Sequence, residues 1–145
     1  MLRPLCRCHG TEPKPHPRKE HLAMNETLYH RLGGRDGIDK LCDRIVELHL
    51  QNDVAGPRYQ ALDQEALERA RIKVKEFIAA GTGGPVEYTG RSMLETHTGM
   101  NVSAAEYVAV MDDIMQAMNE MEYPRPVCDE VLGIAYSLKG EIIHR

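Results

Sequence analysis

The sequence predicts an all-α fold made of several amphipathic helices. Apolar residues recur every three or four positions along most of the chain after residue 24, which is the spacing of one helix face. Glycines and prolines separate these stretches, and no pattern typical of a β-hairpin lies between them. At 145 residues the chain is long enough to bury a hydrophobic core without disulfides, so we expect a single helical domain.

The first two helices are expected before residue 56. Asn25 can cap a short helix that ends at Gly33-Gly34. A longer helix is expected to begin near Asp36, and Gly56-Pro57 is expected to break the chain after it. The apolar face of this longer helix consists of Ile38, Leu41, Ile45 and Leu48.

Two more long helices and one short helix are expected before the last one. Asp63 can cap the first of them, which ends at Gly81, and a short helix lies between Val86 and Gly99. Ser103 and Glu106 have the spacing of a capping box for the next helix. The expected apolar faces are Leu67, Val74, Phe77 and Ile78 in the first long helix, and Tyr107, Val110, Met111, Ile114, Met118 and Met121 in the second.

The last helix is expected after Pro124 and Pro126, which we predict to break the chain. Its apolar face consists of Val127, Val131, Ile134, Ala135, Leu138 and Ile142. Four long amphipathic helices with short connections are typical of an all-α domain.

Charge and composition argue against two classes of partner. The formal net charge of −4 argues against general nucleic-acid binding, which requires a basic surface. No apolar run approaches the length of a membrane span, so we expect a soluble protein. The four cysteines form no Cys-x-x-Cys pair, which favours a reducing compartment and a cytoplasmic location.

Residues 1–23 differ from the rest of the chain. They are rich in proline and basic residues and have no helical apolar period, so we expect a disordered extension before a domain at residues 24–145. Cys6, Cys8, His9 and His16 in this extension offer ligands for a soft metal ion.

His97 is the sharpest candidate for a functional residue. It lies in a short segment between glycines, just before a long apolar helix. A neutral imidazole in such a position can bind haem iron. A histidine in this kind of segment is also often a surface or capping residue, so its position along the chain has to decide between the two roles.

Short motifs in the same order along the chain resemble the truncated haemoglobins of group I. They are residues 28–34 (LYHRLGG), 83–85 (GGP), 88–93 (YTGRSM), 97–103 (HTGMNVS) and 130–133 (EVLG). The resemblance implies a two-over-two globin fold, in which two antiparallel helix pairs enclose a b-type haem. It also implies that His97 is the proximal iron ligand.

The same resemblance implies further contacts to haem. Tyr88, Arg91 and Met93 fall in the loop and helix near the haem propionates, where a cation suits the carboxylates. Val102, Tyr107 and Val110 match apolar haem contacts, and Phe77 and Ile78 match the pair that packs on the other haem face. These apolar residues could equally belong to an ordinary protein core.

The distal side departs from the family's pattern. Val46 stands where most members have a tyrosine that donates a hydrogen bond to bound oxygen, and Tyr59 stands where a phenylalanine is usual. Ala70 and Val74 match positions that often carry polar groups. The remaining donors are Lys73, Tyr59 and His49, and Lys73 matches a position that in some members supplies a sixth iron ligand. Lys73 can instead reach a propionate or water.

The sequence therefore supports three functions. The first is a haem protein that reversibly binds oxygen, NO or CO, with oxygen transport or NO dioxygenation as its use. NO dioxygenation would require an external reductase. The second is a degenerate globin-like module for partner binding or sensing without gas chemistry. The third is metal binding by the cysteines and histidines of the N-terminal segment.

Overall fold

The computed structural model describes residues 26–145, and every element in this part of the chain is a helix. In chain order the helices are α1 (Leu28–Arg31), α2 (Gly34–Gln51), α3 (Gly56–Gln60), α4 (Gln64–Gly81), α5 (Met93–His97), α6 (Ala104–Glu120), α7 (Arg125–Ser137) and α8 (Lys139–Ile142). The expected extension at residues 1–23, its metal ligands and the boundary at residue 24 lie outside the described residues.

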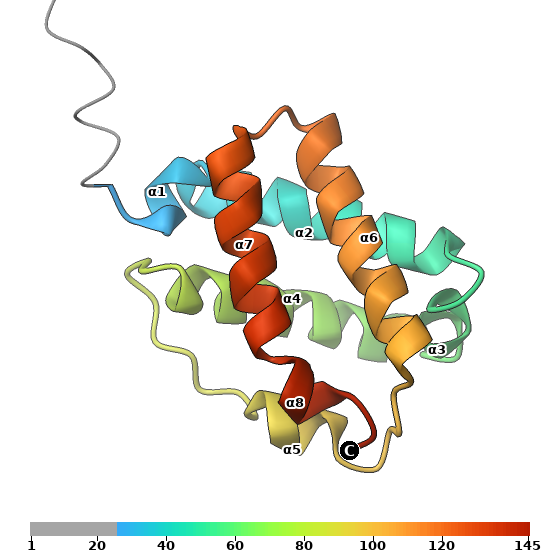
Figure 1. Cartoon of the computed structure of the whole chain (residues 1–145). Coiled ribbons are helices and arrows are strands. Elements are labelled where there is room, and N and C mark those ends of the chain that lie inside the picture. The colour runs from blue at the N-terminus through green and yellow to red at the C-terminus, as the bar shows by residue number, and fades with distance from the viewer. Residues whose placement is uncertain (1–25) are drawn as a thin grey trace, which may run out of the picture.

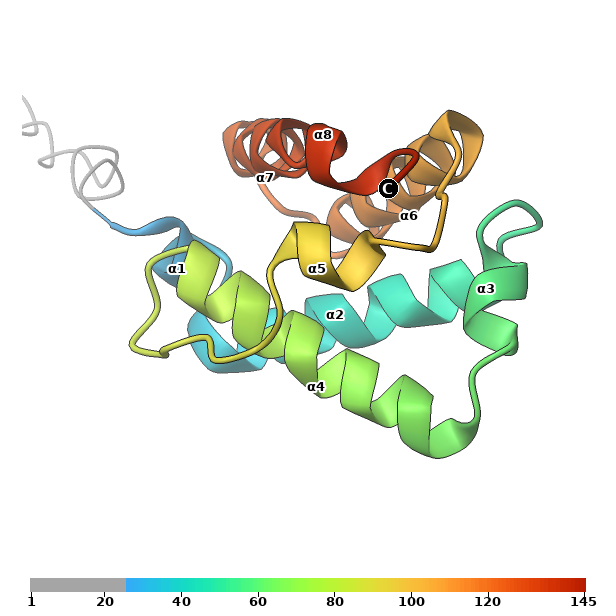
Figure 2. The same cartoon turned by 90° about the horizontal axis from the view of Figure 1, so that it is seen from below.

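The helices form two layers. α2 and α4 cross in one layer, and α6 and α7 run antiparallel in the other (Figures 1 and 2). α2 contacts both α4 and α6, and α6 contacts α7, so α2 joins the layers. The short helix α5 packs against α8 at one edge. The predicted all-α two-over-two sandwich is confirmed.

α1 and α2 begin at other residues than the sequence predicts. Thr27 caps α1, and its hydroxyl accepts a hydrogen bond from the His30 amide at 3.4 Å, so the prediction of a cap at Asn25, outside the described residues, is wrong. Gly33 has a φ of +91°, a conformation that favours glycine. α2 then starts at Gly34, and a Cβ atom on Gly37 would lie 1.9 Å from the Leu32 carbonyl oxygen. Only glycine allows this close approach of the two helices.

The prolines expected to break the chain also begin helices. Pro57 lies in the first turn of α3, and Pro126 lies in the first turn of α7 after the cap Pro124. A proline in the first turn loses no hydrogen bond, because that amide has no partner in the helix. The prediction of simple breaks at these positions is therefore incomplete.

The predicted caps of the long helices are confirmed. The Asp63 carboxylate accepts a hydrogen bond from the Ala66 amide at 2.7 Å. Ser103 and Glu106 form the reciprocal capping box of α6. A second capping box, formed by Ser92 and Glu95, begins α5 and was not predicted.

The core is closed at one end of the sandwich. There α1, the first half of α2, the end of α6 and the start of α7 meet, and Tyr123 donates a hydrogen bond to the Leu32 carbonyl at 2.8 Å. The largest fully buried side chains are Leu32, Ile38, Leu41, Cys42, Met118 and Cys128. Both cysteines are free thiols.

The predicted stripe of α4 is not buried. Ala79 is the only buried residue of this helix, and the stripe residues Leu67, Val74, Phe77 and Ile78 all remain half-exposed. The last predicted face is also interrupted, since Ile134 is exposed and the helix stops at Ser137 before α8 begins. Among the described helices, none is long and apolar enough to cross a membrane.

Candidate functional site

His97 is the last residue of α5, and its ring is held in one orientation. Its Nδ1 atom lies 2.8 Å from the carbonyl oxygen of Met93, one turn earlier. A carbonyl oxygen only accepts, so Nδ1 donates, and the lone pair of the neutral ring is left on Nε2. Both His97 and Met93 are half-exposed. The structure therefore presents an oriented imidazole with a free basic nitrogen.

The segment after His97 is tied to the C-terminal residues. The Asn101 amide donates to the Arg145 carbonyl, and the His144 amide donates to the Val102 carbonyl, both at 2.9 Å. Val102 and Ile143 form an isolated β-bridge. The sequence gives no sign of this link, because the short bridge has no strand pattern on either side.

The structure brings Tyr88 onto Phe77. Their ring centroids are 5.3 Å apart in an edge-to-face arrangement, and the Tyr88 hydroxyl donates to the Arg91 carbonyl at 3.0 Å. The Arg91 side chain is exposed and pairs with no carboxylate among residues 26–145. This loop therefore offers a free cation beside an aromatic pair.

The other predicted apolar residues divide between the core and the open surface. Val102 and Tyr107 are buried, and the Tyr107 hydroxyl donates to the Ala135 carbonyl of α7 at 2.7 Å. Val110 is half-exposed, while Val74 and Ile78 pack against the edge of the core cluster.

A polar cluster lies beside Val46, and the sequence analysis named only His49 and Tyr59 of its members. His49 follows Val46 by one turn of α2, and its Nδ1 is 2.7 Å from the Asp113 carboxylate of α6. Asn52 donates to the other oxygen of that carboxylate at 3.0 Å. Tyr59 of α3 stacks on the His49 ring with a centroid distance of 4.8 Å. For Asp113, the signal in the sequence is a pair of acidic residues, Asp112 and Asp113, between the apolar positions Val110 and Ile114.

Burial sets the protonation of this cluster. It lowers the pKa of His49, although the hydrogen bond and charge of Asp113 act in the opposite direction. Burial, together with the Asp113 charge, raises the pKa of Tyr59 to about 12. The Tyr59 hydroxyl therefore keeps its proton and is available as a donor.

Lys73 forms an ion pair on the surface of α4. Its ammonium lies 2.8 Å from the Glu76 carboxylate, and this hydrogen bond raises the pKa of Lys73. A lysine must lose its proton before it can bind a metal, so the Glu76 contact opposes the role of Lys73 as an iron ligand. Ala70, one turn earlier, is exposed.

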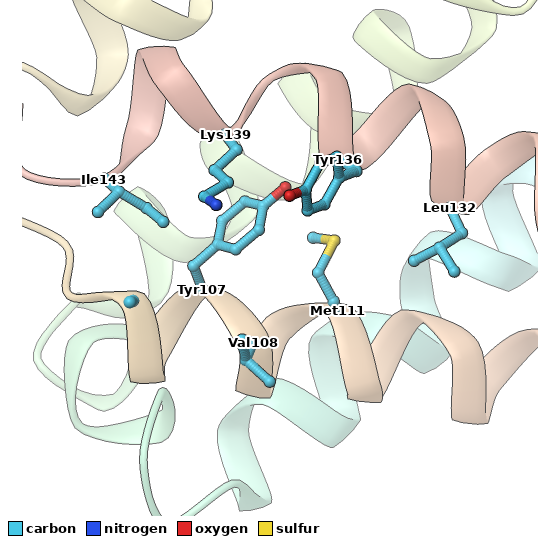
Figure 3. A pocket seen from close by; sticks show the side chains of 8 residues that line it. Tyr107, Val108, Met111, Leu132, Tyr136, Lys139 and Ile143 are labelled. Carbon is cyan, nitrogen blue, oxygen red and sulfur yellow. The ribbon is translucent and has the colours of Figure 1, made fainter.

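An apolar groove separates α6 from α7 and α8 (Figure 3). It has a volume of about 250 Å³ and is lined by Ala104, Tyr107, Val108, Met111, Leu132, Tyr136, Lys139 and Ile143. The Lys139 ammonium lies 5.1 Å from the centre of the Tyr136 ring. Of the residues predicted to contact haem, Tyr107 is the one that lines this groove.

Three features of the described residues fit a haem group. The Nε2 atom of His97 is a free ligand of the type that haem iron takes. The half-exposed side chains of Phe77, Met93 and Val110 provide apolar surface that the protein does not cover. Arg91 provides an unpaired cation for a carboxylate.

The two-layer helical sandwich, the oriented ring of His97 and the half-exposed apolar side chains are together typical of a globin-type haem protein. Residues 27–143 match the family model described as "Bacterial-like globin". The chain therefore belongs to the bacterial-like globin family. Haem binding and the binding of a diatomic gas are the properties of this class.

Relatives support the group I resemblance. The chain is 29% identical to the group 1 truncated hemoglobin GlbN of a Synechocystis species, over 75% of this chain and 89% of the relative. It is 24% identical to GlbN of Mycolicibacterium paratuberculosis, over 80% of this chain and 83% of the relative. The predicted kinship with group I truncated haemoglobins is confirmed.

Solved structures show the same fold. The truncated hemoglobin of Tetrahymena pyriformis in its Fe(III) form superposes with a TM-score of 0.77 at 19% identity, and covers 83% of this chain and 100% of its own. The 2/2 hemoglobin of a Synechococcus species, which carries covalently attached heme, gives a TM-score of 0.74 at 20% identity with the same coverage.

Proposed function

We propose that the chain binds haem b with His97 as the proximal ligand and reversibly takes up oxygen, NO or CO. The hydrogen bond from Nδ1 of His97 to the Met93 carbonyl carries this proposal, because it orients the ring and leaves Nε2 free. When bound, haem supplies an iron atom that accepts an imidazole on one side and a small gas on the other. The names of the relatives and of the solved neighbours support the same reading.

The remaining predicted residues receive packing and charge roles in this proposal. Five half-exposed side chains would provide apolar surface for haem: Val74, Phe77, Ile78, Met93 and Val110. The predicted contacts Val102 and Tyr107 are buried against protein. Arg91 provides a cation for a propionate, and Tyr88 holds the loop by its bond to the Arg91 carbonyl. Val46 is buried and would form part of the apolar wall on the gas side, where Tyr59, stacked on His49, is the nearby polar group.

Absorption spectra of the purified protein test the proposal. The native protein should show a Soret band that shifts on reduction and on addition of CO. His97→Gly should lose haem or alter its coordination, and added imidazole should restore the native spectrum. His30→Ala is the matched control, because His30 is exposed and lies in α1. A native Soret band and unchanged coordination in His97→Gly would contradict the assignment.

One observation favours a second candidate, a globin-like module for sensing or partner binding. Val46 provides no hydrogen-bond donor at the position where the family usually has tyrosine, and this second candidate has no gas chemistry. A protein that stays colourless with added haemin would support this candidate. Cytoplasmic location, oxygen transport and NO dioxygenation with an external reductase remain predictions within the first candidate.

A further inference from the structure

Arg58 in α3 connects the two sides of the candidate site. Its guanidinium donates to the Met100 carbonyl at 2.9 Å and to the Asn101 carbonyl at 3.4 Å. It also pairs with both oxygens of Glu106 in the first turn of α6. A single planar side chain therefore holds the segment after His97 and the helix that follows it.

The contact with Met100 leads directly to His97. The Met100 amide donates to the His97 carbonyl at 3.0 Å, which closes the turn after α5. Gly99 and Asn101 on either side of Met100 both have positive φ, at +88° and +47°. A left-handed conformation at a non-glycine residue costs energy and persists when its surroundings hold it in place.

α5 has few means of holding itself in place. It is five residues long and contains no buried residue. Its position depends on contacts with α8 and on the turn whose Met100 carbonyl accepts a hydrogen bond from Arg58. The orientation of His97 is therefore sensitive to the support that reaches this turn.

The opposite side of α3 is also fixed. Tyr59, next to Arg58, stacks on His49, which is bonded to Asp113 of α6. Asn52 donates to the same carboxylate and accepts from the amides of Val54 and Ala55 just before α3. α3 thus rests on a hydrogen-bonded cluster around the buried pair His49 and Asp113, and Arg58 extends from α3 to the turn after His97.

We propose that Arg58 is a positioning residue for His97, which fixes the proximal turn through the Met100 and Asn101 carbonyls. The inference rests on the proposed function, because it assumes that His97 binds haem iron. Glu106 holds the guanidinium in place, and the same contact lowers the pKa of that carboxyl to about 2.

Resonance Raman spectra of the ferrous, gas-free protein test this proposal through the iron–histidine stretching band. In Arg58→Met the band should shift or broaden, and haem transfer to an acceptor globin should become about tenfold faster, as expected for one lost hydrogen bond to a charged group. Hydrogen exchange of the Met100 amide in the same protein should also become faster. A native band and native Met100 exchange in Arg58→Met would overturn the proposal.

Arg44→Met is the matched control. Arg44 pairs with Glu120 at 2.6 Å and with Glu47 at 3.0 Å, so it joins α2 to α6 by the same chemistry but touches no part of the His97 turn. This variant should lose some thermal stability and keep the native band. An equal band shift in both variants would show a general effect of destabilisation and would overturn the proposal.

Arg58→Lys separates charge from geometry. A lysine keeps a cation opposite Glu106 but lacks the planar fork that reaches two carbonyls and a carboxylate at once. Thermal stability should return toward the native value while the band stays altered. Full recovery of the band would overturn the role of the carbonyl contacts. The proposed function is tested separately by the native protein and His97→Gly. The native protein should show an iron–histidine band, and His97→Gly should lose it. Without this difference the proposed function itself fails.

Discussion

The two ends of the helical sandwich are built from similar amphipathic helices but are filled differently. At the closed end, Leu32, Ile38 and Met118 are almost completely buried against protein. At the open end, on α4 and α5, side chains such as Phe77 and Met93 stay half-exposed. Helix periodicity marks an apolar face but does not say what covers it, and at the open end we propose that haem does.

Haem removal should affect the open end most and gives the largest expected effect. A ligand present at about a thousand times its Kd stabilises the native state by about 4 kcal/mol, and this contribution disappears in the haem-free protein. Denaturant unfolding measures the loss, and hydrogen exchange locates it. Amides of α5 should exchange much faster, while those around Ile38 should change little. Equally faster amide exchange at both ends would contradict the proposal that haem covers only the open end.

In the haem-free protein, alanine substitutions should lower the free energy of unfolding more at the closed end than at the open end. Leu41→Ala removes a fully buried side chain and should lower the free energy of unfolding by about 3 kcal/mol. Phe77→Ala should cost clearly less in the haem-free protein, because the Phe77 ring is already half-exposed, and more when haem is bound. Equal costs for the two variants without haem would show that the open end is packed like the closed one.

Val46→Tyr should slow oxygen release about tenfold, since one good hydrogen bond contributes about 1.4 kcal/mol. The native protein is expected to release oxygen fast, because Val46 and Val74 have no donor. Stopped-flow release rates provide the measurement. Ile45→Tyr is the control, because the adjacent position points about 100° away around α2, toward the core cluster. Slow release by the native protein that Tyr59→Phe or Lys73→Ala abolishes would contradict the apolar pocket.

The His49 cluster, between the two ends, should make stability depend on pH. Burial lowers the pKa of His49 in the folded protein, so the unfolded chain binds the proton more readily. The contribution of neutral His49 to the free energy of unfolding is fully present above the ordinary histidine pKa of 6.5. It is lost as the pH falls through the lower pKa of the folded protein. Unfolding of native and His49→Gln protein between pH 8 and pH 5 should differ in slope. Parallel curves would show that His49 does not cause the dependence.

Deletion of residues 1–23 should have the smallest effect. This segment has no helical apolar period, so we expect the free energy of unfolding to change by less than about 0.5 kcal/mol. Haem affinity should also stay the same. A loss of several kcal/mol in denaturant unfolding would show that the segment packs on the domain.

Local chemistry explains what the sequence predicted well. The Asp63 cap and the capping box of Ser103 and Glu106 involve residues three positions apart, so their pairing is visible in the sequence. The first-turn prolines were harder, since proline both ends one helix and begins another. His97 was singled out because its motif lies in family order, and its role as the iron ligand stays a prediction. Its bond to Met93 required the structure.

Contacts between distant segments explain what the sequence could not predict. His49 and Asp113 are 64 residues apart, and Arg58 reaches Met100 across 42 residues. No periodic pattern connects such pairs, because they depend on how the layers cross. The half-exposure of the α4 stripe escaped prediction for a related reason, since the spacing of Val74 and Phe77 is the same whether protein or cofactor covers them.

The close approach of α1 and α2 at Gly37 limits how this sequence can vary. A library of single substitutions should tolerate no other residue there, because any side chain would collide with the Leu32 backbone. Gly133, within α7, has open space around its missing Cβ and a negative φ. Alanine at that position should be accepted and should stabilise α7 by about 0.5–1 kcal/mol. For stability engineering of this globin, Gly37 therefore has to be kept, whereas Gly133 can be replaced.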